Sequence, residues 1–293
     1  MPTTKEVLED ILEKMHRLSE RSLLMAKKKF IAKEEKKLEK EMAKAFIAQG
    51  KSFLTKFQKE MKPLFEAHNR IWYAPAVIVN GTTFLESWTE EDWLEIFGEA
   101  AEDTMPDFVI PIEQAVTRSL FQGATSLIKQ IGVQINFSLT NPRAEDYIAE
   151  HGAKLVTGIN ETTIGNIRTI MLQAAEEGWS YNTTAKELTD LYSGFAVGKP
   201  QLHIDSRAHL IAVTEVGNAY EAGNAIVGQE LLDAGLQMEK SWLTSNDDRV
   251  SEGCQENQAD GWIPFEDEHT SGDMNPLRFP GCRCTELYRR ARG

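Results

Sequence analysis

The hydrophobic positions of the first sixty residues recur at helical spacing. Two apolar stripes follow one another: Leu8, Ile11, Leu12, Met15 and Leu18, then Leu38, Met42, Phe46, Phe53 and Phe57. Residues three, four or seven apart lie on the same side of a helix. The pattern predicts a helix over most of this region that ends near Pro63, because proline is disfavoured in a helix interior.

The hydrophobic pattern changes after Asn69 and again at Pro111. Residues 69–110 begin with an aromatic and β-branched stretch, which predicts a loop or short strand followed by a helix. Beyond Pro111, short amphipathic segments separated by Gly, Pro or Asn are typical of a compact helical region. Thr184 and Glu187 have the spacing of a capping box before one of these helices.

A helix of about thirty residues is predicted to begin after the N-cap candidates Asp205 and Ser206 and to end at Gly235. This segment is rich in small residues, including Gly217, Gly223 and Gly228. Because a glycine costs about 0.5–1 kcal/mol relative to alanine inside a helix, three of them indicate close approach by a neighbouring backbone.

The period then becomes that of strands. Residues 238–244, 261–265 and 283–290 each predict a short strand, and together a small sheet packed on the long helix. We therefore predict an α+β fold that is predominantly helical, with a small antiparallel sheet. The predicted divisions are a basic helical region, 1–68, a connecting segment, 69–110, and a larger domain, 111–293, which is helical over 111–235 and carries the sheet over 236–293.

Charge is unevenly distributed along the chain. The net charge is −13, yet residues 1–62 hold 16 basic and 10 acidic side chains. A group of six lysines in this region is a candidate contact for DNA or an acidic partner: Lys27, Lys28, Lys29, Lys33, Lys36 and Lys37. We favour a solvated helix face instead, because Glu34, Glu35, Glu39 and Glu41 are interleaved with the lysines.

The composition indicates a soluble protein made in the cytoplasm. No apolar run approaches the roughly 20 residues of a membrane span, and the first residues do not have the pattern of a secretory signal. The three cysteines are odd in number and lie in the last forty positions, which favours reduced or metal-binding thiols over disulfides. We expect no membrane partner.

The C-terminal third resembles the phage head morphogenesis family, the Mu F-like minor head proteins. The resemblance lies in a succession of short elements over some eighty residues: Arg207-Ala208, Ala212 to Glu215, Asn218, Gly223, Lys240-x-Trp242, the run DDRV with Asp248 and Arg249, Gly261, and Cys282-Arg283-Cys284. Each element alone is weak, whereas their order and spacing are specific.

The resemblance implies a structural role and no enzymatic activity. Such proteins enter the procapsid in low copy number, associate with the portal protein and other capsid or scaffold components, and can influence DNA packaging or ejection. The resemblance thus implies location in the virion, in the head near the portal, after synthesis in the host cytoplasm.

Cys254, His269, Cys282 and Cys284 are candidate ligands for zinc, which takes four Cys or His ligands in structural sites. Relatives carry Cys or His at positions that here hold Ser251 and Phe279. We therefore favour no cofactor. In this interpretation the cysteines are small buried hydrophobic residues, and Arg283 binds backbone carbonyls or the carboxylates of Asp247, Asp248 or Glu215.

The alternative function is a metal-dependent hydrolase or nuclease that uses the Cys and His cluster. Glu266, Asp267 and Glu268 precede His269 and could supply acid groups, but consecutive loop residues rarely converge, so a solvated turn is favoured. Glu215 and Asn218, three apart on one helix face, are expected to pair with Arg207 or Arg249 for structure rather than for catalysis.

Overall fold

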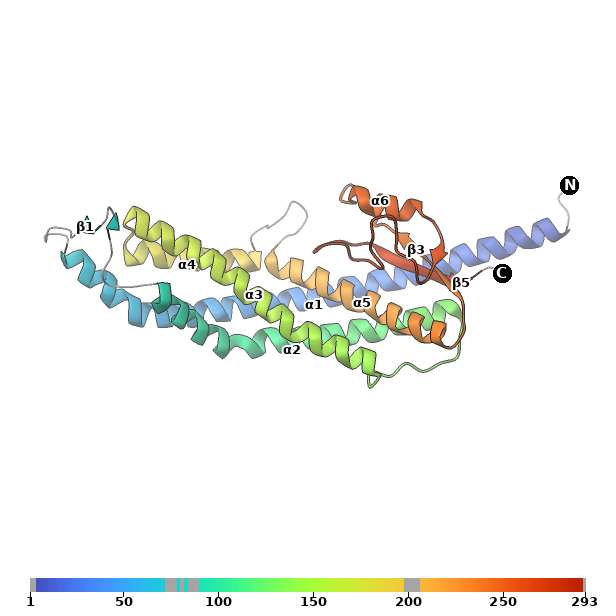
Figure 1. Cartoon of the computed structure of the whole chain (residues 1–293), viewed down its shortest axis with the longest axis horizontal. Helices are drawn as coiled ribbons and strands as arrows, with labels where there is room; N and C mark the ends of the chain where they lie inside the picture. Colours follow the sequence, from blue (N-terminus) through green and yellow to red (C-terminus); the bar gives the residue numbers. More distant parts are fainter. Residues whose placement is uncertain (1–3, 72–77, 80–81, 84–89, 198–205, 292–293) are drawn as a thin grey trace. The chain divides into compact units, whose positions relative to one another are not determined.

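The computed structural model describes residues 4–71, 78–79, 82–83, 90–197 and 206–291 (Figure 1). The helices are α1 (Thr4–Ile71), α2 (Glu90–Ile131), α3 (Pro142–Glu177), α4 (Tyr181–Val197), α5 (Arg207–Asp233) and α6 (Glu252–Ala259). The strands are β1 (Ile78–Val79), β2 (Thr82–Thr83), β3 (Met238–Leu243), β4 (Ile263–Pro264) and β5 (Thr285–Arg290). The predicted α+β, predominantly helical fold class is confirmed.

The chain forms two compact units, each built from separate stretches of sequence. Unit 1 comprises residues 1–39, 112–149 and 209–293, and unit 2 comprises residues 40–111 and 150–208. The long helices α1, α2 and α3 contribute to both units. The division predicted from the sequence follows chain order and stays a prediction. No helix among the described residues carries an apolar stretch long enough to cross a membrane.

Unit 2 has an aromatic core. Phe46 packs edge-on against Phe108 and also contacts Phe195, with ring centroids 5.1 Å apart in both pairs. Phe53 contacts Phe97 and Tyr192 in the same way. These rings are almost fully buried, and each large buried side chain contributes about 1.5–3 kcal/mol. The second apolar stripe predicted for the N-terminal helix is therefore the part of α1 that builds this core.

The helices α1 and α2 are longer than predicted, because their three internal prolines do not end them. Pro63 is inside α1, which continues to Ile71, and Pro106 and Pro111 are inside α2. Pro63 and Pro106 are exposed, so the carbonyl groups that lose a helical donor can bind water. The predicted end of the first helix at Pro63 was wrong, and so was the start of a separate helix at Pro111.

The start of α4 also differs from its prediction. Thr184 lies inside the helix and is buried. The cap is Ser180, whose hydroxyl oxygen accepts from the Thr183 amide at 3.2 Å. Asp205, one of the two N-cap candidates for the long helix, lies outside the described residues.

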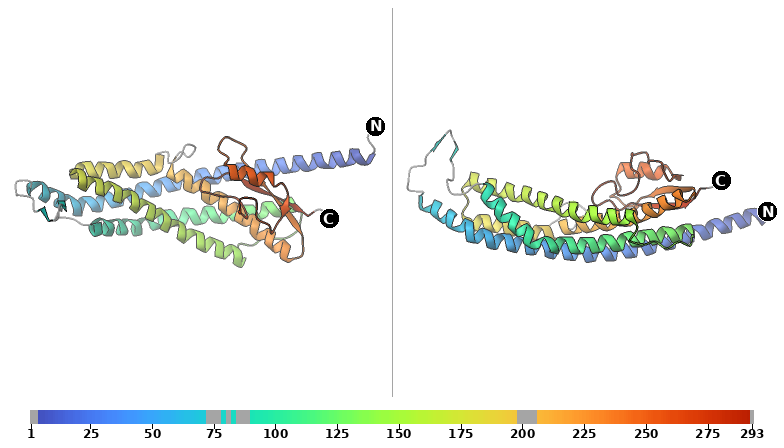
Figure 2. Two further views of the ribbon diagram at one scale, coloured as in Figure 1. Left: turned by 45° about the horizontal axis from the view of Figure 1, so that its top comes forward. Right: turned by 60° about the horizontal axis from the view of Figure 1, so that its bottom comes forward.

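Unit 1 carries the predicted long helix and the predicted sheet. The three strands are antiparallel in the order β4-β3-β5, and Lys240 of β3 is opposite Tyr288 of β5. Figure 2 shows this sheet and α6 beside α5 in both views. One hydrophobic cluster joins the sheet to α2 and α5: Ala124, Leu127, Ile131, Val227, Leu231, Met238, Phe265 and Tyr288. The prediction that the sheet packs on the long helix is confirmed.

The end of α5 follows from its glycine. Gly235 has φ +87°, a conformation that glycine adopts without strain. The amide of Leu236 then donates to the Leu231 carbonyl at 2.9 Å, as in a Schellman motif. This turn leads the chain directly from α5 into β3.

Two glycines bring the backbones of α2 and α5 together. A Cβ atom on Gly223 of α5 would lie 2.0 Å from the Leu120 carbonyl oxygen of α2, and one on Gly123 would lie 1.9 Å from the Tyr220 oxygen. Gly217 and Gly228 face side chains, those of Leu277 and Phe265. The predicted close approach of a neighbouring backbone is confirmed, and it occurs at Gly223.

We predict that Gly223→Ala lowers the free energy of unfolding by about 1–3 kcal/mol, because the added methyl group would meet backbone that cannot rotate away. The matched control is Gly165→Ala in α3, where a Cβ meets nothing within 4 Å. That variant should gain about 0.5–1 kcal/mol from helix propensity. Urea unfolding measures both changes, and equal effects would contradict the close helix contact.

Candidate functional site

Three cysteines meet beneath the sheet of unit 1. Cys254 comes from α6, while Cys282 and Cys284 come from the segment that leads into β5. All three are buried, reduced and packed with Trp242 of β3. Their sulfur atoms lie within 4.8 Å of one another, and the Sγ atoms of Cys254 and Cys282 are 3.9 Å apart. Residues thirty positions apart in sequence thus form one thiol cluster.

Local capping places Cys254. Ser251 is the N-cap of α6, and its hydroxyl accepts from the Cys254 amide at 3.4 Å. Phe279 is 41% exposed, and its carbonyl accepts from the Cys282 amide at 3.0 Å. Ser251 and Phe279, where the resemblance implied metal ligands, thus form hydrogen bonds with the backbone of the cluster residues.

His269 is held in a different network. Its Nε2 lies 3.0 Å from the Glu286 carboxylate and its Nδ1 lies 3.4 Å from Asp260, with the imidazole and Glu286 both buried. Among the described residues, the group of candidate ligand atoms contains the three thiols and not His269. The structure does not bring His269 to the cysteines as the predicted fourth ligand, because two carboxylates engage its ring.

The three thiols differ in acidity. A hydrogen bond with the Cys284 thiol lowers the pKa of Cys282 to about 6, and the same hydrogen bond raises the pKa of Cys284. Burial raises the pKa of Cys254. The cluster therefore favours one thiolate, at Cys282, that accepts from a neighbouring thiol, and a thiolate is the form that binds metals.

One sulfur–sulfur distance in the cluster matches the spacing of zinc ligands. Tetrahedral zinc with Zn–S bonds of about 2.3 Å places two sulfur ligands about 3.8 Å apart, close to the 3.9 Å between Cys254 and Cys282. The three cysteines would supply three of four ligands and leave one coordination position open. Zinc bound here would tie α6 to the segment before β5.

A groove opens beside the cysteines within unit 1. It has a volume of about 340 Å³ and is lined by α1, α5 and the C-terminal segment, including Cys282 and Cys284. Glu221 of α5 lies in its wall and is 3% exposed. The Thr285 hydroxyl donates to Glu221 at 2.7 Å, and the Lys27 ammonium pairs with the same carboxylate oxygen. One acid thus joins α1, α5 and β5.

The role of Glu221 was missed in the sequence. The available signal was an acid among the small and apolar residues of the long helix, where a charged side chain must find a partner when buried. The Lys27 ammonium lies 4.4 Å from the Tyr220 ring centroid as well as beside Glu221. Lys27, predicted among the contacts to DNA or a partner, is instead a buried residue that fixes α1 in unit 1.

Glu215 lacks the arginine partner predicted for it. Arg207 donates to the Thr163 hydroxyl at 2.9 Å and to the Ile159 carbonyl at 2.7 Å, and Arg249 pairs with Asp247 at 2.6 Å. The Glu215 side chain is buried, and its Oε2 has no hydrogen-bond partner in the described part of the chain. Burial raises the pKa of Glu215 to about 7, and the proton makes the buried group neutral.

The other motif residues have structural positions. Asn218 is half-buried on α5, Trp242 is buried against the thiols, and Asp248 is exposed in a turn. Gly261 has φ +68° in the turn before β4. These residues stabilise the chain path rather than converge on a pocket.

The partners predicted for Arg283 were wrong. Its guanidinium lies 3.8 Å from Glu35 of α1 and 3.2 Å from His209 of α5, not beside Asp247, Asp248 or Glu215. Because α1 is far away in sequence, its acids could not be chosen as partners from the local motif. Arg283 therefore joins the C-x-C segment to two helices.

The acidic loop does not form an acid cluster with His269. Glu266, Asp267 and Glu268 are all exposed, whereas His269 is buried. The loop therefore has the character of the solvated turn favoured in the sequence.

Unit 1 is a helical region closed by a small antiparallel sheet, with a buried thiol cluster beside the sheet. Residues 165–287 match the family model described as Phage Mu protein F like protein. This region, which covers less than half of the chain, belongs to the Mu F-like phage head morphogenesis family. The resemblance stated from the motifs is confirmed. No curated protein and no solved structure matches the chain significantly.

The convergence of the three thiols replaces the expectation of no cofactor with a proposal of zinc. We predict that the folded protein binds one zinc ion per chain and that Cys282→Ser abolishes this binding, because the site loses its thiolate ligand. Elemental analysis after dialysis against zinc measures the ratio. His269→Gln is the control and should keep the metal in its folded fraction. Wild-type protein that stays metal-free would show that the cysteines are packing residues alone.

We also predict that Glu215 makes stability depend on pH. Its pKa is about 7 in the folded chain against an ordinary value of 4.5. The stabilisation is therefore complete below the ordinary pKa and is lost as pH rises through about 7. Relative to Glu215→Gln, the wild type should lose up to about 3 kcal/mol between about pH 5 and pH 8. Parallel pH profiles in urea unfolding would contradict the assignment.

Proposed function

We propose that this protein is a structural minor head protein of a tailed phage, which associates with the portal protein during procapsid assembly and influences DNA packaging or ejection. The single observation that carries the proposal is the family match over residues 165–287. In this proposal the protein acts by binding other head components and not by catalysis.

The matched region gives the proposal a physical basis. It contains α4 of unit 2 and, in unit 1, nearly all of α5, the strands β3 and β4, the start of β5 and the thiol cluster. Within unit 1, buried side chains join α5 to the sheet. The carboxylate of Glu221 and the guanidinium of Arg283 both connect α1 to this region. The packed sheet and helices of unit 1 suit a component that must present a defined surface to a larger assembly.

The alternative of a metal-dependent hydrolase or nuclease has weaker support. A zinc ion on the three cysteines would have an open coordination position, as catalytic zinc requires. However, the acids of the 266–268 loop are exposed and His269 is engaged by Glu286 and Asp260, so neither is placed to assist such a metal. Hydrolysis of DNA by zinc-loaded wild type, and not by Cys282→Ser, would favour the enzyme.

The proposal is tested by assembling procapsids from the phage's own major capsid, scaffold and portal proteins together with this chain. We expect the protein in purified procapsids at low copy number, and its loss from particles assembled without portal. Quantitative mass spectrometry of gradient-purified particles measures both. Gly165→Ala, where the added Cβ meets nothing within 4 Å, is the control: it should enter procapsids as the wild type does.

The outcomes separate the parts of the proposal. Incorporation that is unchanged without portal would overturn portal association and leave a role in the head. Absence from particles under every condition, with the protein folded and present during assembly, would overturn the structural role itself.

A further inference from the structure

We infer that the outer face of α1 in unit 1 binds the phosphate backbone of double-stranded DNA. This basic face consists of five exposed lysines: Lys28, Lys29, Lys33, Lys36 and Lys37. The inference goes beyond the proposed function, because it holds whether or not the protein contacts the portal.

The acids interleaved with these lysines in sequence do not neutralise them. Three of the four lie against other elements of unit 1: Glu34 pairs with Arg118 at 2.8 Å, Glu35 is 3.8 Å from Arg283, and Glu39 is 3.6 Å from His209. The fourth, Glu41, pairs with Lys44 of the same helix at 2.9 Å and not with a lysine of the basic face. Glu34 is 5% exposed. The sequence argument for a mutually neutralised helix face therefore fails, because Glu34 and Glu35 engage arginines of other elements while the five lysines are exposed.

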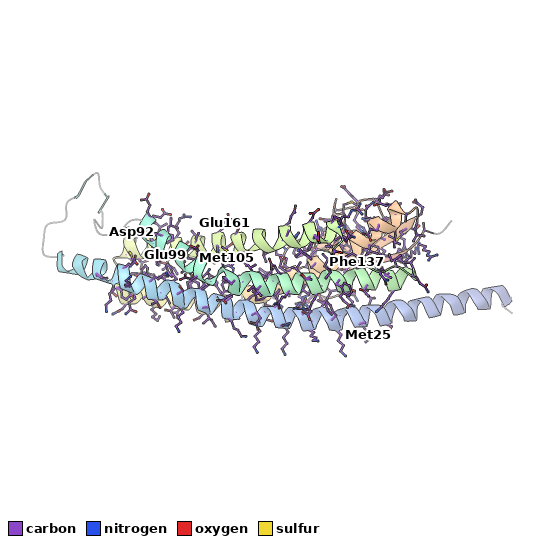
Figure 3. All side chains as sticks on the ribbon, turned by 90° about the horizontal axis from the view of Figure 1, so that it is seen from below. Met25, Asp92, Glu99, Met105, Phe137 and Glu161 are labelled. Atoms are coloured by element: carbon purple, nitrogen blue, oxygen red, sulfur yellow. The ribbon has the colours of Figure 1, made fainter. Side chains whose placement is uncertain are left out.

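The lysines themselves are exposed and uncompensated. None of the five forms an ion pair with a residue that the structure describes, in contrast to Lys27. Lys29, Lys33 and Lys36 follow one another at four- and three-residue spacing, which aligns them along one helix face. Figure 3 labels Met25, which is 65% exposed, on the outer side of α1, where side chains point away from the helix.

The form of this charge fits a duplex. At a rise of about 1.5 Å per residue, the five lysines span about 14 Å. The two acids within this span, Glu34 and Glu35, lie against Arg118 and Arg283, so the strip is positive on its outer side. Double-stranded DNA carries one negative charge per roughly 1.7 Å of axis, so such a strip can contact several phosphates at once. The acidic surface of a protein usually also carries some positive charges, so it matches a strip of lysines less well than a DNA duplex does.

The residue types indicate contact with phosphates and not with bases. Lysine is a point charge that suits phosphate oxygens, whereas base reading in the grooves mostly uses the planar groups of Arg, Asn and Gln. Single-stranded nucleic acid is usually bound by stacking on aromatic rings. The described residues of the basic face include no aromatic side chain. We therefore expect binding to duplex DNA of any sequence.

The rest of the chain restricts how DNA can approach. Residues beyond 62 hold 16 basic and 35 acidic side chains, so most of the surface repels a polyanion. A second copy of this chain, through its acidic surface, is the main competing partner for the lysines. The test below distinguishes the two.

The test compares two variants of the full chain with four lysines neutralised in each. The first carries Lys29→Gln, Lys33→Gln, Lys36→Gln and Lys37→Gln on the basic face. The matched control carries Lys51→Gln, Lys59→Gln, Lys129→Gln and Lys186→Gln, which are exposed lysines elsewhere. Fluorescence anisotropy with a mixed-sequence duplex, titrated at several salt concentrations, gives the affinity and its salt slope.

We expect wild type and control to bind with an affinity that falls steeply between about 50 and 200 mM salt. The basic-face variant should bind at least about tenfold more weakly at low salt, with a log–log slope smaller by up to about 3.6. Replacing the same four lysines by arginine should retain binding, since the charge remains.

Equal weakening in the control would overturn the assignment to this face. Wild-type affinity that does not change with salt would overturn the phosphate contact, even if a neutralised variant failed to fold. Self-association at low salt that requires the four lysines, without DNA binding, would identify a second copy as the partner. Procapsid incorporation of the basic-face variant is read separately, so failure of the DNA inference and failure of the portal proposal remain distinguishable.

Discussion

The backbone contact between α2 and α5 is the constraint on which the rest of unit 1 depends. A side chain at Gly223 or Gly123 would occupy the space of a carbonyl oxygen from the other helix. Because these helices can approach so closely, Leu127 and Val227 form one buried surface that the sheet covers through Tyr288 and its neighbours. The helix α5 also places Glu221 beside β5, where the Glu221 carboxylate accepts from the Thr285 hydroxyl and pairs with Lys27.

In unit 1, several acidic side chains of α1 and α5 contact other elements, whereas five lysines of α1 are exposed to solvent. Three ion pairs join these elements: Glu34 with Arg118, Glu35 with Arg283, and Glu221 with Lys27. A buried acid without such a partner is costly, which is why Glu215 retains its proton up to about pH 7. The exposed lysines of the basic face on α1 need no acidic partner, because water solvates them. The net charge of −13 therefore conceals a locally positive surface on α1.

Periodicity predicted the type of most elements, but it missed the short helix α6 and the continuation of α1 and α2 through their prolines. The long helix, the three strands and their packing followed from local patterns, because helix and strand period depend on neighbouring positions. The predicted end of α1 at Pro63 was wrong, because the proline faces solvent and the helix continues past it. His269 was chosen as a ligand for its residue type, but Glu286 and Asp260 hold it. The partners of Arg283 and Lys27 lie on helices that no local motif identifies. The thiol cluster, in contrast, could be predicted because its members are few.

The most direct test is an electron cryomicroscopy map of the phage particle, refined without imposed icosahedral symmetry, in which this chain is located. The account predicts density for the α5 and sheet region inside the head at the portal vertex. Density confined to sites away from the portal, or no density in a particle shown by mass spectrometry to lack the chain, would contradict it.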